Sequence, residues 1–249
     1  MAQTRRLGRL QPAHLLALLS LVILPPTAAW ADKVWGSVSG FEHLENPVWK
    51  EAKDPKNKGY SFREMVPTVP AKYRKLYPHI PRELCLVALS TQDQPAQPAT
   101  LIRVGGGRTT PVTIVVTPGT KLVFQNTDPF KHRLYIKGDS NFQPNDTDRG
   151  GKREWSATKP GVYEVRDELA PSLRMWIIAE PKVAAISYPS MKGDFNLSVA
   201  QPGDYQIQAY FAGQRVGEAV PVKLDRGDVR LPAPIVVGKP DQGADKGGK

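Results

Sequence analysis

The residues best able to do chemistry in this chain of 249 residues are one histidine and two adjacent carboxylates. His132 offers one nitrogen ligand, and Asp167 and Glu168 offer carboxylate oxygens. This is a thin set for zinc or copper(II), and neighbouring residues of a strand or loop point their side chains apart. These three residues are therefore weak candidates for a metal site.

The alternative is a structural role for the same residues. His132 would then be a hydrogen-bonding residue, and Asp167 or Glu168 would pair with Arg133, Arg166 or Arg174. We favour this interpretation because the three histidines beyond residue 31 form no spacing motif; they are His43, His79 and His132. We therefore predict no bound metal.

Catalytic motifs are missing from the sequence. It contains no Gly-x-Ser-x-Gly elbow, no His-Glu-x-x-His pair and no phosphate-binding glycine loop. The run Gly105-Gly106-Gly107-Arg108 joins two predicted strands, which favours a linker or wide turn. The only cysteine, Cys85, lies in an apolar run without a neighbouring histidine, so we expect a buried small hydrophobe. We predict a protein that is not an enzyme and has no catalytic residue and no cofactor.

The first 31 residues have the three parts of a cleavable signal peptide. Arg5, Arg6 and Arg9 precede an apolar run of about ten residues, and Ala29 and Ala31 are small residues at the positions that a signal peptidase reads. The run is short of the roughly twenty residues that span a bilayer. We predict cleavage after Ala31, a periplasmic or extracellular protein, and no transmembrane segment in the mature chain.

The chain is basic, with a formal charge of +10. Such a surface favours anionic partners, although a solvated face that keeps the protein soluble explains it as well. Nucleic acid is a poor candidate, since the sequence shows no reader motif. We expect the partner to be another envelope protein or an anionic glycan.

Short apolar runs separated by proline and glycine predict an all-β protein. We expect strands at residues 34–38, 84–89, 100–104, 112–116, 121–125, 132–136, 161–165, 175–179, 194–199, 205–211, 219–224 and 235–237. Two segments depart from this pattern: an excursion at about 42–77 that is rich in aromatic and basic residues, and a tail at 239–249 that we expect to be disordered. The excursion offers a possible contact surface, formed by Trp49, Tyr60, Phe62, Tyr73 and Tyr77.

The segment from Pro111 to Pro181 resembles the cupredoxins. It contains a Thr-Pro-Gly turn, a strand ending in Phe124-Gln125-Asn126-Thr127-Asp128, and then a histidine. The resemblance is closest to exported proteins of the methylamine-utilisation-like family, in which a cupredoxin half precedes a carboxypeptidase-regulatory-like, or transthyretin-like, β module. It implies a cupredoxin-like Greek-key sandwich plus a smaller transthyretin-like sandwich. The expected segments are 32–110 with the excursion, 111–183 as the cupredoxin-like domain, and 184–238 as the second module.

The resemblance also implies that the type 1 copper site is mostly lost. Copper-binding relatives have a thiolate, a second imidazole and an axial thioether in the closing loop. Here Asp167, Ala170 and Leu173 stand at those positions, and only His132 matches a ligand. A blue-copper centre needs two imidazoles and a thiolate.

Two functions follow as hypotheses. The favoured one is a non-catalytic binding or scaffold protein of a bacterial cell envelope, without type 1 copper. The alternative is a metal-dependent redox or enzymatic protein that uses His132 with nearby carboxylates. The sequence leaves open whether the cupredoxin-like part precedes the second module or is inserted into it.

Overall fold

The computed structural model describes residues 31–48, 51 and 78–239 of the chain. Nearly every element in this part is a strand, so the predicted all-β class is confirmed. The helical elements include η1 (Phe41–His43) and α2 (Ile80–Glu83). The strands are β1 (Asp32–Ser39), β2 (Leu84–Ser90), β3 (Thr100–Gly105), β4 (Arg108–Thr110), β5 (Thr113–Val116), β6 (Lys121–Asn126), β7 (Leu134–Ile136), β8 (Lys152–Ser156), β9 (Gly161–Asp167), β10 (Arg174–Ala179), β11 (Val183–Ser187), β12 (Asp194–Val199), β13 (Gly203–Phe211), β14 (Gln214–Leu224), β15 (Val229–Arg230) and β16 (Ile235–Val236).

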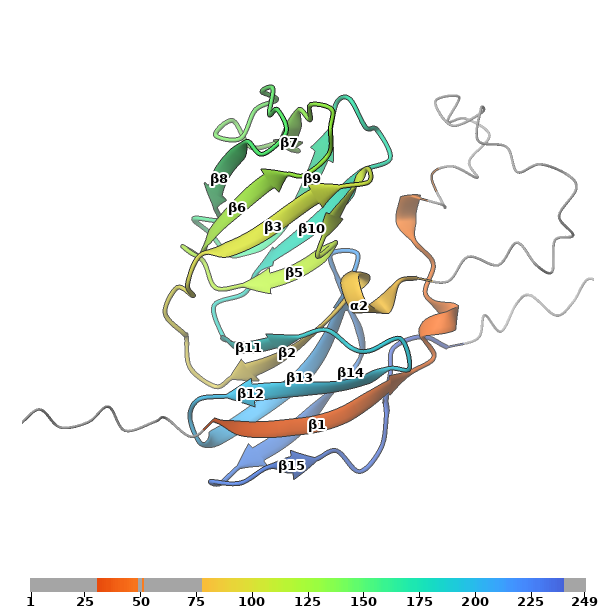
Figure 1. Ribbon diagram of the computed structural model, residues 1–249. Helices are drawn as coiled ribbons and strands as arrows, with labels where there is room; N and C mark the ends of the chain where they lie inside the picture. Colours follow the sequence, from red (N-terminus) through yellow and green to blue (C-terminus); the bar gives the residue numbers. More distant parts are fainter. Residues whose placement is uncertain (1–30, 49–50, 52–77, 240–249) are drawn as a thin grey trace, which may run out of the picture.

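The strands form two sandwiches, one above the other in Figure 1. The upper one consists of a sheet with the order β4-β3-β6-β8 and a sheet with the order β5-β10-β9-β7. The lower one pairs the sheet β11-β2-β13-β14 with a sheet in which β1 is flanked by β12 on one side and by β15 and β16 on the other.

The chain order shows that the upper sandwich is inserted into the lower one. Strands β1 and β2 precede the upper sandwich and β11 to β16 follow it, yet all of them belong to the lower sandwich. We therefore call the upper unit the inserted sandwich and the lower unit the split sandwich. The inserted sandwich also begins earlier than the expected boundary at residue 111, because β3 pairs with β6 and β4 pairs with β3.

Alternating side chains give each sandwich its own core. In β6 the residues Leu122, Phe124 and Asn126 are buried, and the residues between them are exposed or half-buried. β12 alternates in the same way, so that Phe195, Leu197 and Val199 face the core of the split sandwich. One face of each of these strands packs, and the other meets solvent.

Strand β2 breaks this pattern because it is buried on both faces. Leu84, Leu86 and Ala88 enter the core of the split sandwich. Cys85, Val87 and Leu89 point the other way and pack against the inserted sandwich. We call this second cluster the seam, and its buried members are Cys85, Val87, Leu89, Val115, Ile178, Val183 and Tyr210.

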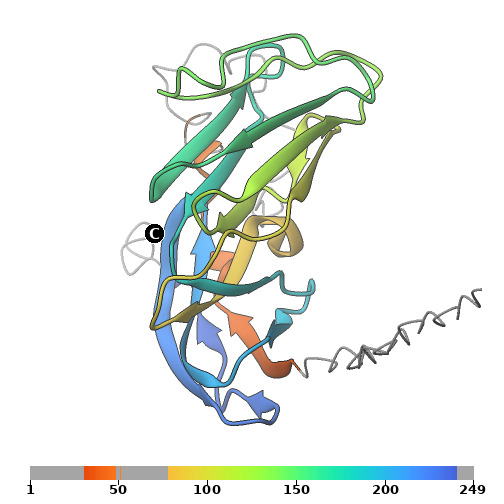
Figure 2. The ribbon, with the colours of Figure 1, turned by 90° about the vertical axis from the view of Figure 1, so that its left-hand side faces the viewer.

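The β13–β14 hairpin extends the seam. In Figure 2 the blue strands of this hairpin run upward from the split sandwich toward the inserted one. The backbone N–H of Ala212 in the hairpin turn donates to Thr113 Oγ1 at 3.3 Å. Gly213 has φ of +80°, and a Cβ there would lie 2.8 Å from Trp176 Cδ1, so this close approach requires glycine.

All twelve predicted strand positions are occupied by strands, with shifted ends. The predicted strand at 132–136 begins at Leu134, because His132 lies in the preceding loop and forms an isolated bridge with Thr147. Strands β4, β8, β11 and β15 were not predicted. β8 lies at the edge of its sheet. Its sequence, Lys-Arg-Glu-Trp-Ser, contains too few apolar side chains to predict a strand.

Several predictions fall outside the described residues. These are the signal peptide up to residue 30, all five residues of the possible contact surface, most of the excursion and the tail from residue 240. Within the described part, no helix has the length and apolar character to cross a membrane.

Candidate functional site

The candidate site lies at one end of the inserted sandwich, where the β6–β7 loop meets the end of β9. His132 belongs to this loop and is fully buried. Its backbone exchanges two hydrogen bonds with Thr147, at 3.1 and 2.8 Å. Asp167, the last residue of β9, pairs in register with Leu134 of β7. The strand pairing therefore brings Asp167 next to the histidine.

Both nitrogens of the His132 ring contact carboxylates. Nδ1 lies 2.5 Å from Asp167 Oδ2, and Nε2 lies 3.0 Å from Asp128 Oδ2. Asp128 and Asp167 are themselves buried. We call these three residues the polar triad. Because the two nitrogens face opposite sides of the ring, the triad is a linear chain of hydrogen bonds with the histidine at its centre.

Asp128 is held by the glycine turn between β3 and β4. The backbone N–H of Gly106 donates to Oδ1 at 2.8 Å, and that of Gly107 donates to Oδ2 at 3.4 Å. Both glycines have positive φ, +62° and +67°, which is why this run is a tight hairpin turn and not a linker. Burial acts to raise the pKa of Asp128, but the hydrogen bonds from Gly106, His132 and Gly107 outweigh it and lower the pKa.

Asp167 is held by the loop that follows it. Its Oδ1 accepts hydrogen bonds from the backbone N–H groups of Leu169 at 2.7 Å, Ala170 at 3.2 Å and Arg133 at 3.3 Å. The carboxylate therefore orders the closing loop and also contacts His132. Each of its oxygens already has a hydrogen-bonding partner.

Asn126 fixes the other side of the histidine. Its Nδ2 donates to the carbonyls of Phe130 and Thr147, both at 2.8 Å, and its Oδ1 accepts from the backbone N–H of Asp128, also at 2.8 Å. The Asn-x-Asp part of the sequence motif is thus a loop-shaping device that delivers both Asp128 and His132 to the triad.

Copper, which a cupredoxin fold implies, does not fit these residues. A metal bound to both an imidazole nitrogen and a carboxylate oxygen at 2.0–2.2 Å requires about 3.4 Å between those two atoms in tetrahedral geometry. Nδ1 and Oδ2 lie 2.5 Å apart, so there is no room for an ion between them. Leu173, at the thioether position, is buried in the core of the inserted sandwich. No group of three or more potential ligands converges among the described residues.

The ion pairs predicted between Asp167 or Glu168 and the nearby arginines are formed only in part. Glu168 pairs with Arg133 at 2.9 Å, as the structural interpretation proposed. Asp167 pairs with His132 and not with an arginine side chain. Arg166 and Arg174 bind Glu164, at 2.8 and 3.0 Å. The role of Asp128 was not predicted, although it is the last residue of the quoted motif.

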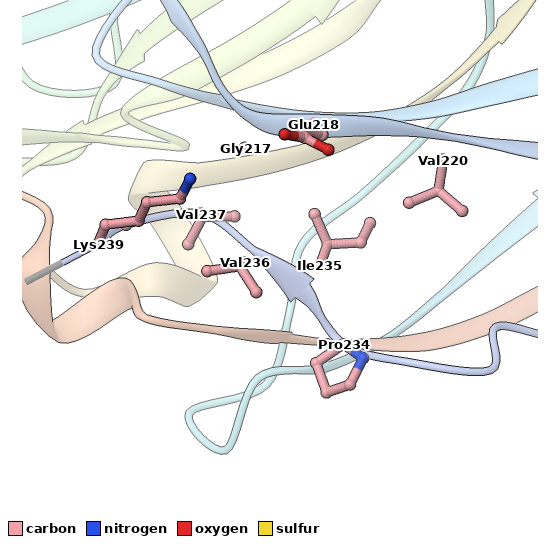
Figure 3. Close-up of a pocket in the computed structure, with 9 residues that line it drawn as sticks. Gly217, Glu218, Val220, Pro234, Ile235, Val236, Val237 and Lys239 are labelled. Carbon is pink, nitrogen blue, oxygen red and sulfur yellow. The ribbon is translucent and has the colours of Figure 1, made fainter.

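Two further features, the thiol of Cys85 and a cavity beside β14, lack the groups of a reactive site. Cys85 is fully buried in the seam, and burial raises its pKa to about 12, so it is not a reactive thiol. A cavity of about 610 Å³ lies between β14 and the C-terminal strand, as Figure 3 shows. Its lining is mostly aliphatic, with Glu218 and Lys239 on opposite walls. This lining contains no nucleophile and no pair of groups suited to acid–base chemistry.

No protein-family model and no curated protein matches this chain. Solved structures of cupredoxins do. A purple cupredoxin from Nitrosopumilus maritimus is 19% identical, with a TM-score of 0.29, over 32% of this chain and 99% of its own. Amicyanin from Paracoccus versutus is 15% identical, with a TM-score of 0.31, over 37% of this chain and 91% of its own. A copper-containing nitrite reductase from Thermus scotoductus is 21% identical, with a TM-score of 0.29, over 38% of this chain and 25% of its own.

Proposed function

We propose that this chain is an exported, non-catalytic binding or scaffold protein of a bacterial cell envelope that works without copper. The observation that carries the proposal is the polar triad. Both ring nitrogens of His132 contact carboxylate oxygens, at 2.5 and 3.0 Å, so neither has a lone pair directed at an open position. The one residue that matches a copper ligand is thus part of the structural framework.

Binding is the function that the described residues support, because their groups able to do chemistry are buried or already paired. The His132 ring at the centre of the triad has no open access to solvent, since His132 is 0% exposed. The thiol is buried as well, and the larger cavity has an aliphatic lining. A partner that is an envelope protein or an anionic glycan agrees with the basic sequence. The aromatic residues of the excursion stay a predicted contact surface for that partner.

Metal analysis of the purified mature chain tests the copper-free part of the proposal. The protein is incubated with copper(II) or zinc(II) and dialysed, and the bound metal is measured together with the visible spectrum. We expect less than stoichiometric metal and no charge-transfer band, with no difference between the wild type, His132→Ala and the surface control His43→Ala. One metal ion per chain that is lost only in His132→Ala would instead establish the metal-dependent alternative.

A pull-down from envelope extract tests the binding part. Substituting the five aromatic residues of the excursion by serine is expected to abolish capture of a specific partner. Capture that persists in this variant assigns the contact to another surface of the protein.

A further inference from the structure

The loops around the polar triad present two large apolar side chains to solvent. Phe130 is 52% exposed and Leu169 is 50% exposed, at the end of the inserted sandwich. The Phe130 ring lies 5.1 Å from the His132 ring, and the N–H of Leu169 donates to Asp167. Each thus lies beside one of the two residues joined by the shortest contact of the triad. Large apolar side chains exposed on the loops at one end of a domain favour an interaction surface there.

The backbone of this surface is held in place. The carbonyl of Phe130 accepts a hydrogen bond from Asn126 Nδ2, and the N–H of Leu169 is bound by Asp167 Oδ1. The triad joins these two loops through His132. Binding partners lose less conformational entropy when the contacting residues are ordered beforehand. The triad therefore prepares the surface for binding although it does not touch a partner.

A recess at this end has Leu169 in its lining, together with Lys131, which follows Phe130 in the sequence. It has a volume of about 520 Å³ and is lined by Lys131, Arg133, Asn145, Asp146 and Leu169. Leu169 gives it an apolar wall, and the cations of Lys131 and Arg133 are groups that attract the face of an aromatic ring. The same end of the molecule thus offers an exposed aromatic ring, Phe130, and a recess with an apolar wall and two cations.

The charges around the recess cancel. Lys131 binds Asp146 at 2.8 Å, and Arg133 binds Asp146 at 3.0 Å and Glu168 at 2.9 Å. The two cations and two anions of these ion pairs balance one another, although the chain as a whole carries a formal charge of +10. Two copies of so basic a chain repel each other, and a neutral apolar surface is where they approach at least cost.

We propose that this surface binds a second copy of the chain in a twofold symmetric dimer. In a twofold interface residue i of one copy contacts residue j of the other and the reverse, so the surface must complement itself. The exposed ring of Phe130, the recess and the balanced ion pairs give a surface that can complement a second copy of itself. The Phe130 ring of each copy enters the recess formed by Lys131, Arg133 and Leu169 of the other. The inference rests on the proposed function, because it treats this end as a binding surface and not as a copper centre.

Sedimentation of the mature protein at increasing concentration tests the dimer. We expect the weight-average mass to rise toward two chains, and Phe130→Asp and Leu169→Asp to raise the dissociation constant at least about tenfold each. The milder Phe130→Ala follows in the same direction. The matched control is Met191→Asp, at an exposed apolar residue of the split sandwich (62% exposed), which leaves the dimer unchanged. Circular dichroism confirms that each variant is folded.

A distance measurement identifies the surface directly. Because Cys85 is buried, a nitroxide label on Arg149→Cys, at an exposed residue that does not line the recess, is the only label that the folded chain takes up. We expect electron paramagnetic resonance to detect a defined distance between two labels, which Phe130→Asp removes. A protein that stays monomeric at every concentration, or a dimer that ignores both aspartate variants, overturns the inference. If the two aspartate variants instead lose the binding of a different protein and leave the dimer unchanged, the inference is also overturned. None of these outcomes depends on the metal analysis, which decides the proposed function separately.

Discussion

The polar triad and the seam both join segments that are distant in sequence, but they do so by opposite means. The triad links the β6–β7 loop to the end of β9 through a buried histidine and two buried carboxylates, so it depends on direction and charge. The seam joins the two sandwiches through apolar side chains such as Val87, Val115 and Ile178, so it depends on buried area. Removing one group therefore has different consequences in the two regions.

Removing the centre of the triad is expected to have the largest effect. His132→Ala leaves two buried carboxylates facing a void, and breaking a buried ionic pair costs about 3–5 kcal/mol. Urea unfolding followed by fluorescence measures the loss. His43→Ala, at a partly exposed histidine, is the control and is expected to cost less than about 0.5 kcal/mol. A loss below about 1 kcal/mol in His132→Ala would show that the triad does not hold these loops together.

The second largest effect is expected from shortening an apolar side chain of the seam. Ile178 is 6% exposed and belongs to the seam, so Ile178→Ala removes apolar contact and leaves a cavity, at a cost of about 2–4 kcal/mol. Leu101→Ala, at an exposed residue of β3, is the control for the loss of an aliphatic side chain. Thermal unfolding measures both. Equal effects of the two substitutions would mean that the sandwiches do not stabilise each other.

The strands were predictable from the sequence because each one carries its own apolar pattern. Leu84 to Leu89 is a continuous apolar run, and the structure explains it by burial of β2 on both faces. The insertion was not predictable, because it depends on the pairing of β1 with β12, two strands on either side of the whole inserted sandwich. Local patterns contain no information on which distant strands pair.

The candidate site was predictable only in part. The resemblance singled out His132 and Asp167, because they stand at two ligand positions of copper-binding relatives. Their direct contact was not predicted, because two ligands of one metal lie around the ion and do not touch each other. The contact of Asp128 with His132 was not predicted. A spacing of four residues predicts contact between two side chains in a helix, but here both residues lie in a loop. The quoted Asn-x-Asp motif was the available signal.

A smaller effect is expected from a single hydrogen bond of the seam. Tyr188 Oη donates to the carbonyl of Thr113 at 2.9 Å, across the two sandwiches. Tyr188→Phe leaves this carbonyl without its donor and should cost about 1 kcal/mol. Tyr163→Phe removes an equivalent but exposed bond to Lys159, so it is the matched control and should cost less. If both variants unfold at the same urea concentration, the bond adds nothing to the seam.

The smallest effect is a pH dependence that distinguishes the seam from the triad at alkaline pH. Burial raises the pKa of Cys85 from an ordinary 9.0 to about 12. The unfolded thiol ionises first, so the stability that this thiol contributes is complete below pH 9 and is lost as the pH rises toward 12. At pH 9.5 the loss is about 0.8 kcal/mol relative to pH 8. Urea unfolding at both pH values measures it, and Cys85→Ala should reduce the difference by that amount. If the thiol of the folded protein instead reacts with iodoacetamide at pH 9 as fast as that of the unfolded chain, the seam is open to solvent, and its contrast with the closed triad fails.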